Sequence, residues 1–204
     1  MAFTHTKTRL SVRTALSLAL ITSLSGCAAA GAVSAVAQIA SLAMNSTGMN
    51  KPADPNATRE IQLKILASNA LNTDDKNQPF SVVIRIYQLK QSSAFQQAFY
   101  DVFLNQQKEI LSGDVIAVKE VTLIPGQKYV NTEKVAVTAD YLGVVALFHA
   151  PAAGRWKLTF PTKDTNRNGL ALGVSECSIT VTTGHSLEYA EGTQNIIKKP
   201  AICG

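Results

Sequence analysis

The sequence has few of the residues from which catalytic and metal-binding sites are built. It contains three histidines and three cysteines, and none of them stand at His-x-x-x-His or Cys-x-x-Cys spacing. No Gly-x-Ser-x-Gly segment and no glycine-rich phosphate loop occurs. The local motifs of metal sites, nucleotide-binding loops and serine hydrolases are therefore missing, and we expect no catalysis, metal or cofactor.

Charge is also scarce, and most of the net positive charge lies near the N-terminus. Charged residues make up 16% of the chain, with 19 basic and 14 acidic side chains. Three of the basic residues, Lys7, Arg9 and Arg13, fall within residues 1–26, which hold no acid. Beyond that segment 16 basic residues face 14 acidic ones. This balance predicts no nucleic-acid partner.

Residues 1–26 have the layout of a bacterial lipoprotein signal peptide. An apolar run from Ala15 to Leu24 is about ten residues long, whereas a membrane span needs about 20. The run leads into Leu24-Ser25-Gly26-Cys27, which matches the lipobox where diacylglycerol is attached to the cysteine thiol. We interpret Cys27 as the lipid attachment site; an ordinary signal peptide and a signal anchor are the alternatives. Ala28, in place of Asp, favours sorting to the outer membrane.

Residues 27–58 are predicted to be a lipid-anchored tether or a membrane-proximal helix. Residues 28–50 are mainly small and carry no charge. A second membrane pass is less favoured, because Ala, Ser and Gly dominate and Gln38 interrupts the run. Two prolines at 52 and 55 end the segment. Residues 59–204 are then predicted to form the periplasmic domain.

After residue 60 apolar and polar residues alternate, as in strands with one buried face. We expect strands near residues 61–67, 80–87, 118–124, 128–138, 155–161 and 175–183. Residues 141–148 are apolar on both faces and predict a central strand. Pro125-Gly126 suits a tight turn. So many short strands indicate a mainly β chain folded as a β-sandwich.

One helical segment interrupts the strands. Ser93 and Gln96 have the spacing of a capping box, which predicts a helix start. One face of this helix carries Phe95, Phe99, Val102 and Phe103. Such a stripe could dock a partner, but more often it seats a helix on its own sheet, and we expect that arrangement here.

Cys177 and Cys203 remain once Cys27 is assigned to the lipid. Two thiols in an oxidising periplasm can pair. Closing this loop would stabilise the fold by about 3 kcal/mol on the chain-entropy model. Two separate buried thiols are the alternative; we favour the disulfide because it would tie the C-terminal tail to a strand.

The segment between the first two predicted strands is longer than a hairpin needs. Residues 69–79 are polar and turn-prone, whereas hairpin loops use about two to five residues. Taken alone, this segment is most simply a surface connection. Loops on a rigid sandwich also often carry recognition residues.

Several stretches resemble one known family, in the expected order. They are the lipobox, Gly31-Ala32-Val33, Leu71-Asn72 with Pro79, Val82 to Leu89, Ala94-Phe95, Leu123 to Gln127, Tyr141 to Ala146, and Arg155-Trp156-Lys157. Together they cover about residues 24–160. They resemble the outer-membrane lipoprotein of the type VI secretion system, the TssJ family. The Cys177–Cys203 pair is not part of this resemblance.

The resemblance implies a transthyretin-like β-sandwich with a short inserted helical segment, at the periplasmic face of the outer membrane. It also implies a partner, the periplasmic C-terminal region of a TssM-like inner-membrane protein, bound by the loop between strands one and two. That loop consists of Leu71, Asn72, Thr73, Asp74, Asp75, Lys76, Asn77 and Gln78. The competing interpretations are a periplasmic carrier of a small ligand or cell-wall fragment, and an anchored hydrolase using His149 or His185.

Replacing Cys27 by Ser removes the thiol that would carry the acyl chains. Each buried methylene contributes about 0.8 kcal/mol to membrane binding, so we expect the variant to leave the membrane. We also expect the variant to stay folded, and secretion to be abolished in cells that carry it. Membrane fractionation beside the wild type measures the displacement. Recovery of the variant in outer-membrane fractions would contradict the anchor.

Overall fold

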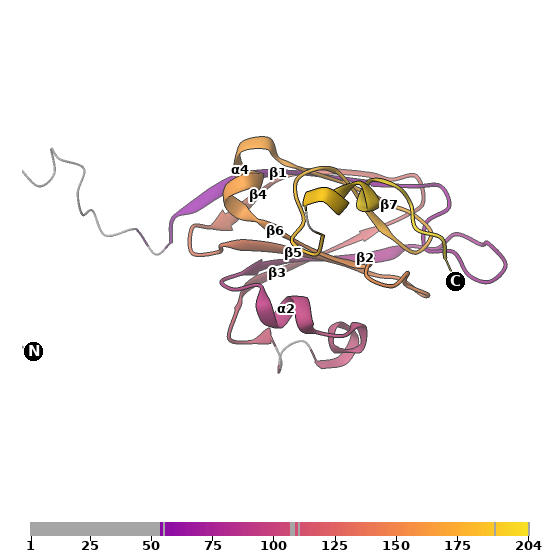
Figure 1. Cartoon of the computed structure of the whole chain (residues 1–204), viewed down its shortest axis with the longest axis horizontal. Coiled ribbons are helices and arrows are strands. Elements are labelled where there is room, and N and C mark those ends of the chain that lie inside the picture. Colours follow the sequence, from indigo (N-terminus) through magenta and orange to yellow (C-terminus); the bar gives the residue numbers. More distant parts are fainter. Residues whose placement is uncertain (1–53, 55, 107–108, 110, 190, 204) are drawn as a thin grey trace, which may run out of the picture. The chain divides into compact units, whose positions relative to one another are not determined.

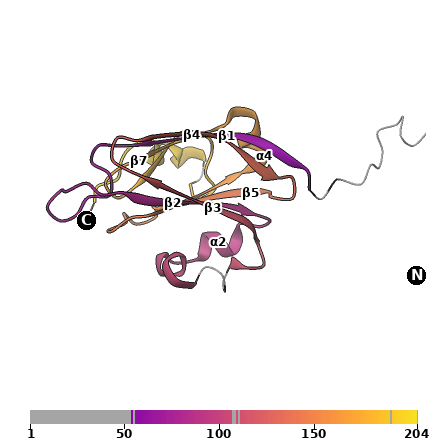
Figure 2. The same ribbon diagram turned by 180° about the vertical axis from the view of Figure 1, so that it is seen from behind.

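The computed structural model describes residues 54, 56–106, 109, 111–189 and 191–203, so Cys27 and most of the predicted tether lie outside it. The described chain forms two four-stranded sheets (Figure 1, Figure 2). The first sheet has the order β4 (Lys128–Ala136), β1 (Thr58–Ala67), β7 (Leu170–Val174) and β8 (Ile179–Thr183). The second has the order β3 (Val115–Leu123), β2 (Val82–Leu89), β5 (Tyr141–Leu147) and β6 (Lys157–Pro161). The short helical elements are α2 (Ser93–Gln97), η1 (Val102–Gln106), α4 (Thr162–Asn168) and η2 (Glu191–Lys198).

The sandwich core lies between the two sheets. In β1, Ile61, Leu63 and Ile65 are buried while the residues between them face water, so the predicted alternation is confirmed. The opposite sheet contributes buried side chains such as Ile84 and Phe160 to the same cluster. The expected β-sandwich is therefore the observed fold, with each sheet burying one apolar face against the other.

The two edges formed by β3 and β4 are bridged by polar contacts. Glu133 accepts hydrogen bonds from the Lys119 ammonium at 2.8 Å, the Tyr129 hydroxyl at 2.6 Å and the Asn131 amide at 2.7 Å. Burial by itself would raise the pKa of Glu133, but these hydrogen bonds outweigh it and lower the pKa below its ordinary value. The ionised carboxylate thus links β4 of one sheet to Lys119 on β3 of the other.

A second apolar layer covers the outer face of β2 and β5. The segment between β2 and β3 folds back over this face (Figure 1). Phe95 and Phe103 from this insert pack on Tyr87 of β2, with ring centroids 5.3 and 5.9 Å apart. At Gly143 of β5 an added Cβ would lie 2.4 Å from the Phe95 ring, so glycine lets the ring approach the strand. The prediction that residues 141–148 form a strand buried on both faces is confirmed by β5.

A buried ammonium group holds the insert to the sheet. Lys157 of β6 is only 8% exposed. Its Nζ donates to the carbonyl oxygens of Phe95, Gln96 and Ala98 at 2.8, 2.8 and 2.7 Å. The same nitrogen lies 4.9 Å from the centre of the Trp156 ring. Burial lowers the pKa of Lys157 to about 8, so the amine is mainly charged at neutral pH.

The helical insert differs from the prediction in two ways. The helix ends at Gln97 because Ala98 is extended, so Phe99 turns outward and is 79% exposed. The predicted capping box is also wrong: the N-cap is Ser92 without a side-chain cap, and Ser93 Oγ accepts from Gln97 Nε2. The predicted aromatic stripe on the sheet is confirmed for its other three members.

Three of the described elements were not expected from the sequence: α4, β7 and η2. Helix α4 carries the chain from β6 to β7, and β7 pairs in parallel with β1. The strand predicted at 175–183 begins only at Ile179, after a turn. Among the described residues no helix is long and apolar enough to cross a membrane.

Replacing Lys157 by Met would leave three carbonyl oxygens of the insert without their donor. Each unpaired buried acceptor costs about 1–3 kcal/mol, so we expect the free energy of unfolding to fall by roughly 2–4 kcal/mol. Urea denaturation measures this, with Lys163→Met, at an exposed position in α4, as the control. Equal stability of the two variants would show that the ammonium does not hold the insert.

Candidate partner-binding site

The loop between β1 and β2 projects from one end of the sandwich, opposite the end where β1 begins (Figure 1, Figure 2). The turn between β3 and β4 lies at its base, where the Gly126 N–H donates to Ser68 O at 3.0 Å. Gly126 has φ 75°, which confirms the predicted Pro-Gly turn, although this turn joins strands of different sheets. The C-terminal tail ends beside the loop in both views.

The base of the loop is buried and tightly bonded. Leu71 is 0% and Asn72 7% exposed. Asn72 Oδ1 accepts from the His149 N–H at 2.7 Å, and Asn72 Nδ2 donates to Ser81 O at 2.8 Å. Leu71 O accepts from the Phe80 N–H at 2.9 Å. These two residues therefore hold the loop on the sandwich.

The tip of the loop is closed by one carboxylate. Asp74 Oδ1 accepts from the backbone N–H groups of Lys76 and Gln78 at 2.9 and 2.8 Å. Asn77 adopts φ 58°, a left-handed conformation that asparagine tolerates well. The tip is thus ordered by its own hydrogen bonds, while the side chains of residues 75–78 are exposed to solvent.

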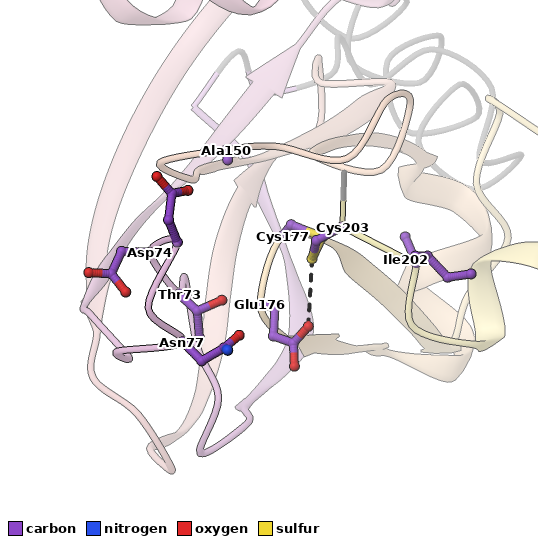
Figure 3. A pocket seen from close by; sticks show the side chains of 10 residues that line it. Thr73, Asp74, Asn77, Ala150, Glu176, Cys177, Ile202 and Cys203 are labelled. Carbon is purple, nitrogen blue, oxygen red and sulfur yellow. Dashed lines mark hydrogen bonds between the residues drawn. A yellow bond between two sulfur atoms is a disulfide. The ribbon is translucent and has the colours of Figure 1, made fainter.

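A hollow of about 610 Å³ lies between the loop and the C-terminal tail. It is lined by Thr73, Asp74, Asp75, Asn77, Ala150, Glu176, Cys177, Ala201, Ile202 and Cys203, most of which Figure 3 labels. Three of these residues are acidic and none is basic. The hollow therefore presents negative charge beside the tip of the loop.

A disulfide forms one wall of the hollow. Cys177 and Cys203 are bonded, with their Cα atoms 5.9 Å apart, and this is the pairing that the sequence favours. The Ala201 N–H also donates to Ser178 Oγ at 3.1 Å. Glu176 Oε2 lies 3.6 Å from Cys203 Sγ, the dashed contact in Figure 3; the sulfur carries no hydrogen, so this is a packing contact. The tail is in this way fixed to the turn before β8.

No arrangement for metal chemistry is found in the part of the chain that the structure describes. No three His, Cys, Asp or Glu side chains there converge closely enough to hold a metal ion. His149 contributes its backbone N–H to the base of the loop. The hollow is bordered by an ordered loop, a charged rim and a covalently held tail.

A known protein family matches the chain over most of the described domain. A family model described as type VI secretion lipoprotein (VasD, EvfM, TssJ, VC_A0113) matches residues 59–177, which is more than half of the sequence. The chain belongs to this family. The match confirms the resemblance seen in the sequence of this type VI secretion lipoprotein. No curated protein matches the chain.

Solved structures agree with the assignment. A chain of a structure described as a type VI membrane complex is 32% identical, with TM-score 0.58, over 62% of this lipoprotein and 100% of that chain. A chain of a structure described as the T6SS protein TssM C-terminal domain (869-1107) from EAEC is 34% identical, with TM-score 0.53, over 59% and 98%. The lipoprotein TssJ1 from Pseudomonas aeruginosa shares the fold at 21% identity and TM-score 0.57, over 63% and 98%.

The sequence pointed to some of the residues around the hollow of this lipoprotein and not to others. It singled out residues 71–78, of which the structure buries Leu71 and Asn72 and exposes residues 75–78. It did not bring Glu176 or the tail residues Ala201 and Ile202 to the loop. The predicted disulfide was the one signal in the sequence for these residues. Because Cys203 is bonded to Cys177, the adjacent residues Ile202 and Glu176 lie at the same hollow.

Replacing Asn72 by Ala would leave the His149 N–H and the Ser81 carbonyl without their partners. We expect the free energy of unfolding to fall by about 2–4 kcal/mol, since both groups are part-buried. Asn77→Ala is the matched control. Asn72 and Asn77 both have a left-handed backbone, with φ 48° and 58°, but the side chain of Asn77 is exposed. Equal urea midpoints for the two variants would mean that backbone strain, not the hydrogen bonds, sets the cost.

Proposed function

We propose that this lipoprotein is held at the periplasmic face of the outer membrane by acyl chains on Cys27, and that residues 73–78 bind a TssM-like inner-membrane protein. The partner contact would lie in the periplasmic C-terminal region of that protein. The observation that carries the proposal is an exposed, internally bonded loop tip at the end of the sandwich away from the start of β1. A solved chain from the structure described as the TssM C-terminal domain, 34% identical to this one, supports the choice of partner.

The direction of β1 separates the two attachments. Its ten residues, Thr58–Ala67, span about 33 Å at about 3.3 Å per residue. The anchored segment would join the domain at Thr58, while the loop follows Ala67 at the other end. The sandwich thus acts as a rigid spacer that presents the loop away from the end where the chain enters.

The ordered tip favours binding over catalysis. A loop that is already folded loses little conformational entropy when a partner docks, which raises affinity without new contacts. The neighbouring hollow is open and lined by carboxylates, whereas sites for small ligands are usually enclosed and apolar. These features support a scaffold that catalyses nothing, rather than a carrier or a hydrolase.

A binding assay with loop variants tests the proposal. The full-length lipoprotein in detergent is titrated with the periplasmic C-terminal region of the TssM-like protein of the same cell. Changing Asp75, Lys76 and Gln78 to Ala should weaken binding about tenfold or more, because these exposed side chains would form the contact.

Three exposed residues of α4 provide the matched control. Lys163, Asp164 and Arg167, changed together to Ala, alter a comparable surface at the end where β1 begins. This variant should bind like the wild type. Failure of the wild type itself to bind would refute the proposed partner and favour the alternative function, a periplasmic carrier of a small ligand or cell-wall fragment.

A further inference from the structure

The C-terminal tail borders the same hollow as the proposed partner loop, although it lies outside the residues that match the family. The match ends at residue 177, which is the first cysteine of the disulfide. Ala201, Ile202 and Cys203 line the hollow together with Thr73 and Asp74. Figure 3 shows Cys203 and Ile202 to one side of Thr73 and Asp74. The tail is therefore a feature of this chain that continues the surface of the loop.

The tail holds an aliphatic side chain out in water. Ile202 is 97% exposed, although the residues on either side of it are fixed. Cys203 is bonded to Cys177, and the Ala201 N–H donates to Ser178 Oγ. Burying such a side chain in an interface is favourable, and it costs little entropy because the backbone is already held.

The charge of the hollow indicates what would enter it. Asp74 uses Oδ1 to close the loop, whereas Asp75 and Glu176 expose their carboxylates at the rim. No basic side chain lines the hollow, and its acids are not gathered as metal ligands in the described residues. An ammonium or guanidinium group on a long side chain fits this distribution, since it can reach between carboxylates that do not converge.

We propose that the disulfide-tied tail, residues 201–203, forms with Glu176 and the loop a composite docking site for a segment of the partner that carries a Lys or Arg next to an apolar residue. The cationic group enters between the carboxylates, and the apolar residue covers Ile202. The disulfide between Cys177 and Cys203 is then required for full affinity, because the tail of the reduced protein is no longer held at the side of the hollow. This inference rests on the proposed function and assigns the chemistry of the same contact.

Variants outside the loop test the tail separately from the proposed partner. Glu176→Gln and Ile202→Ser are measured in full-length lipoprotein against the same periplasmic region of the TssM-like protein. We expect each to weaken binding about fivefold or more, and Glu176→Gln also to reduce the salt dependence of the affinity. Asp164→Asn and Ile196→Ser are the controls, because they alter an exposed acid and an exposed aliphatic residue elsewhere and should bind like the wild type.

The disulfide is tested with Cys177→Ser/Cys203→Ser. This double variant should weaken binding at least as much as Ile202→Ser, with circular dichroism showing that the fold is kept. If it unfolds, the result with Ile202→Ser decides, because that exposed side chain contributes nothing to the core.

The outcomes separate the two proposals. Loss of affinity in both the tail variants and the loop variant supports the composite site. Wild-type affinity in Glu176→Gln and Ile202→Ser, with binding lost in the loop variant, overturns the composite site and leaves the proposed function intact. Absence of binding by the wild type overturns both.

Discussion

The packing of two apolar sheet faces against each other is the constraint on which the rest of this structure depends. Strand β1 is central to it, because Ile61, Leu63 and Ile65 all enter the core and the strand is paired on both sides, by β4 and β7. A register slip by one residue would turn all three out of the core, so the register of β1 is strongly specified. Because β1 runs along the sandwich, the start of the domain and the loop between β1 and β2 lie at opposite ends.

Strands β2 and β5 of the second sheet carry buried side chains on both faces, and a short helix alone provides little cover for the outer face. Helix α2 has only five residues and begins without a side-chain cap, so little of its stability is local. Lys157 supplies what the helix lacks, since its ammonium satisfies three carbonyl oxygens of the insert and lies against an aromatic wall. The cost of burying one charge is offset by hydrogen bonds that no apolar residue could make.

The candidate site combines three segments that are distant in sequence. The loop supplies an ordered tip, the turn before β8 supplies Glu176, and the tail supplies Ile202. Each is fixed by a different device: Asn72 at the base of the loop, the sheet under the turn, and the disulfide at the tail. A surface prepared in this way can bind a partner without rearrangement.

The sequence by itself determined the strand-rich class, the buried face of β1 and the central place of β5, because alternation with a period of two is a local property. It also pointed to the loop, through its length, and to the family, through specific stretches. Only the tertiary structure decided that the helix stops at Gln97, that Leu71 and Asn72 are buried, and that β7 pairs with β1. These outcomes depend on which distant groups meet, such as Lys157 with the carbonyls of the insert, and no local pattern encodes such a meeting.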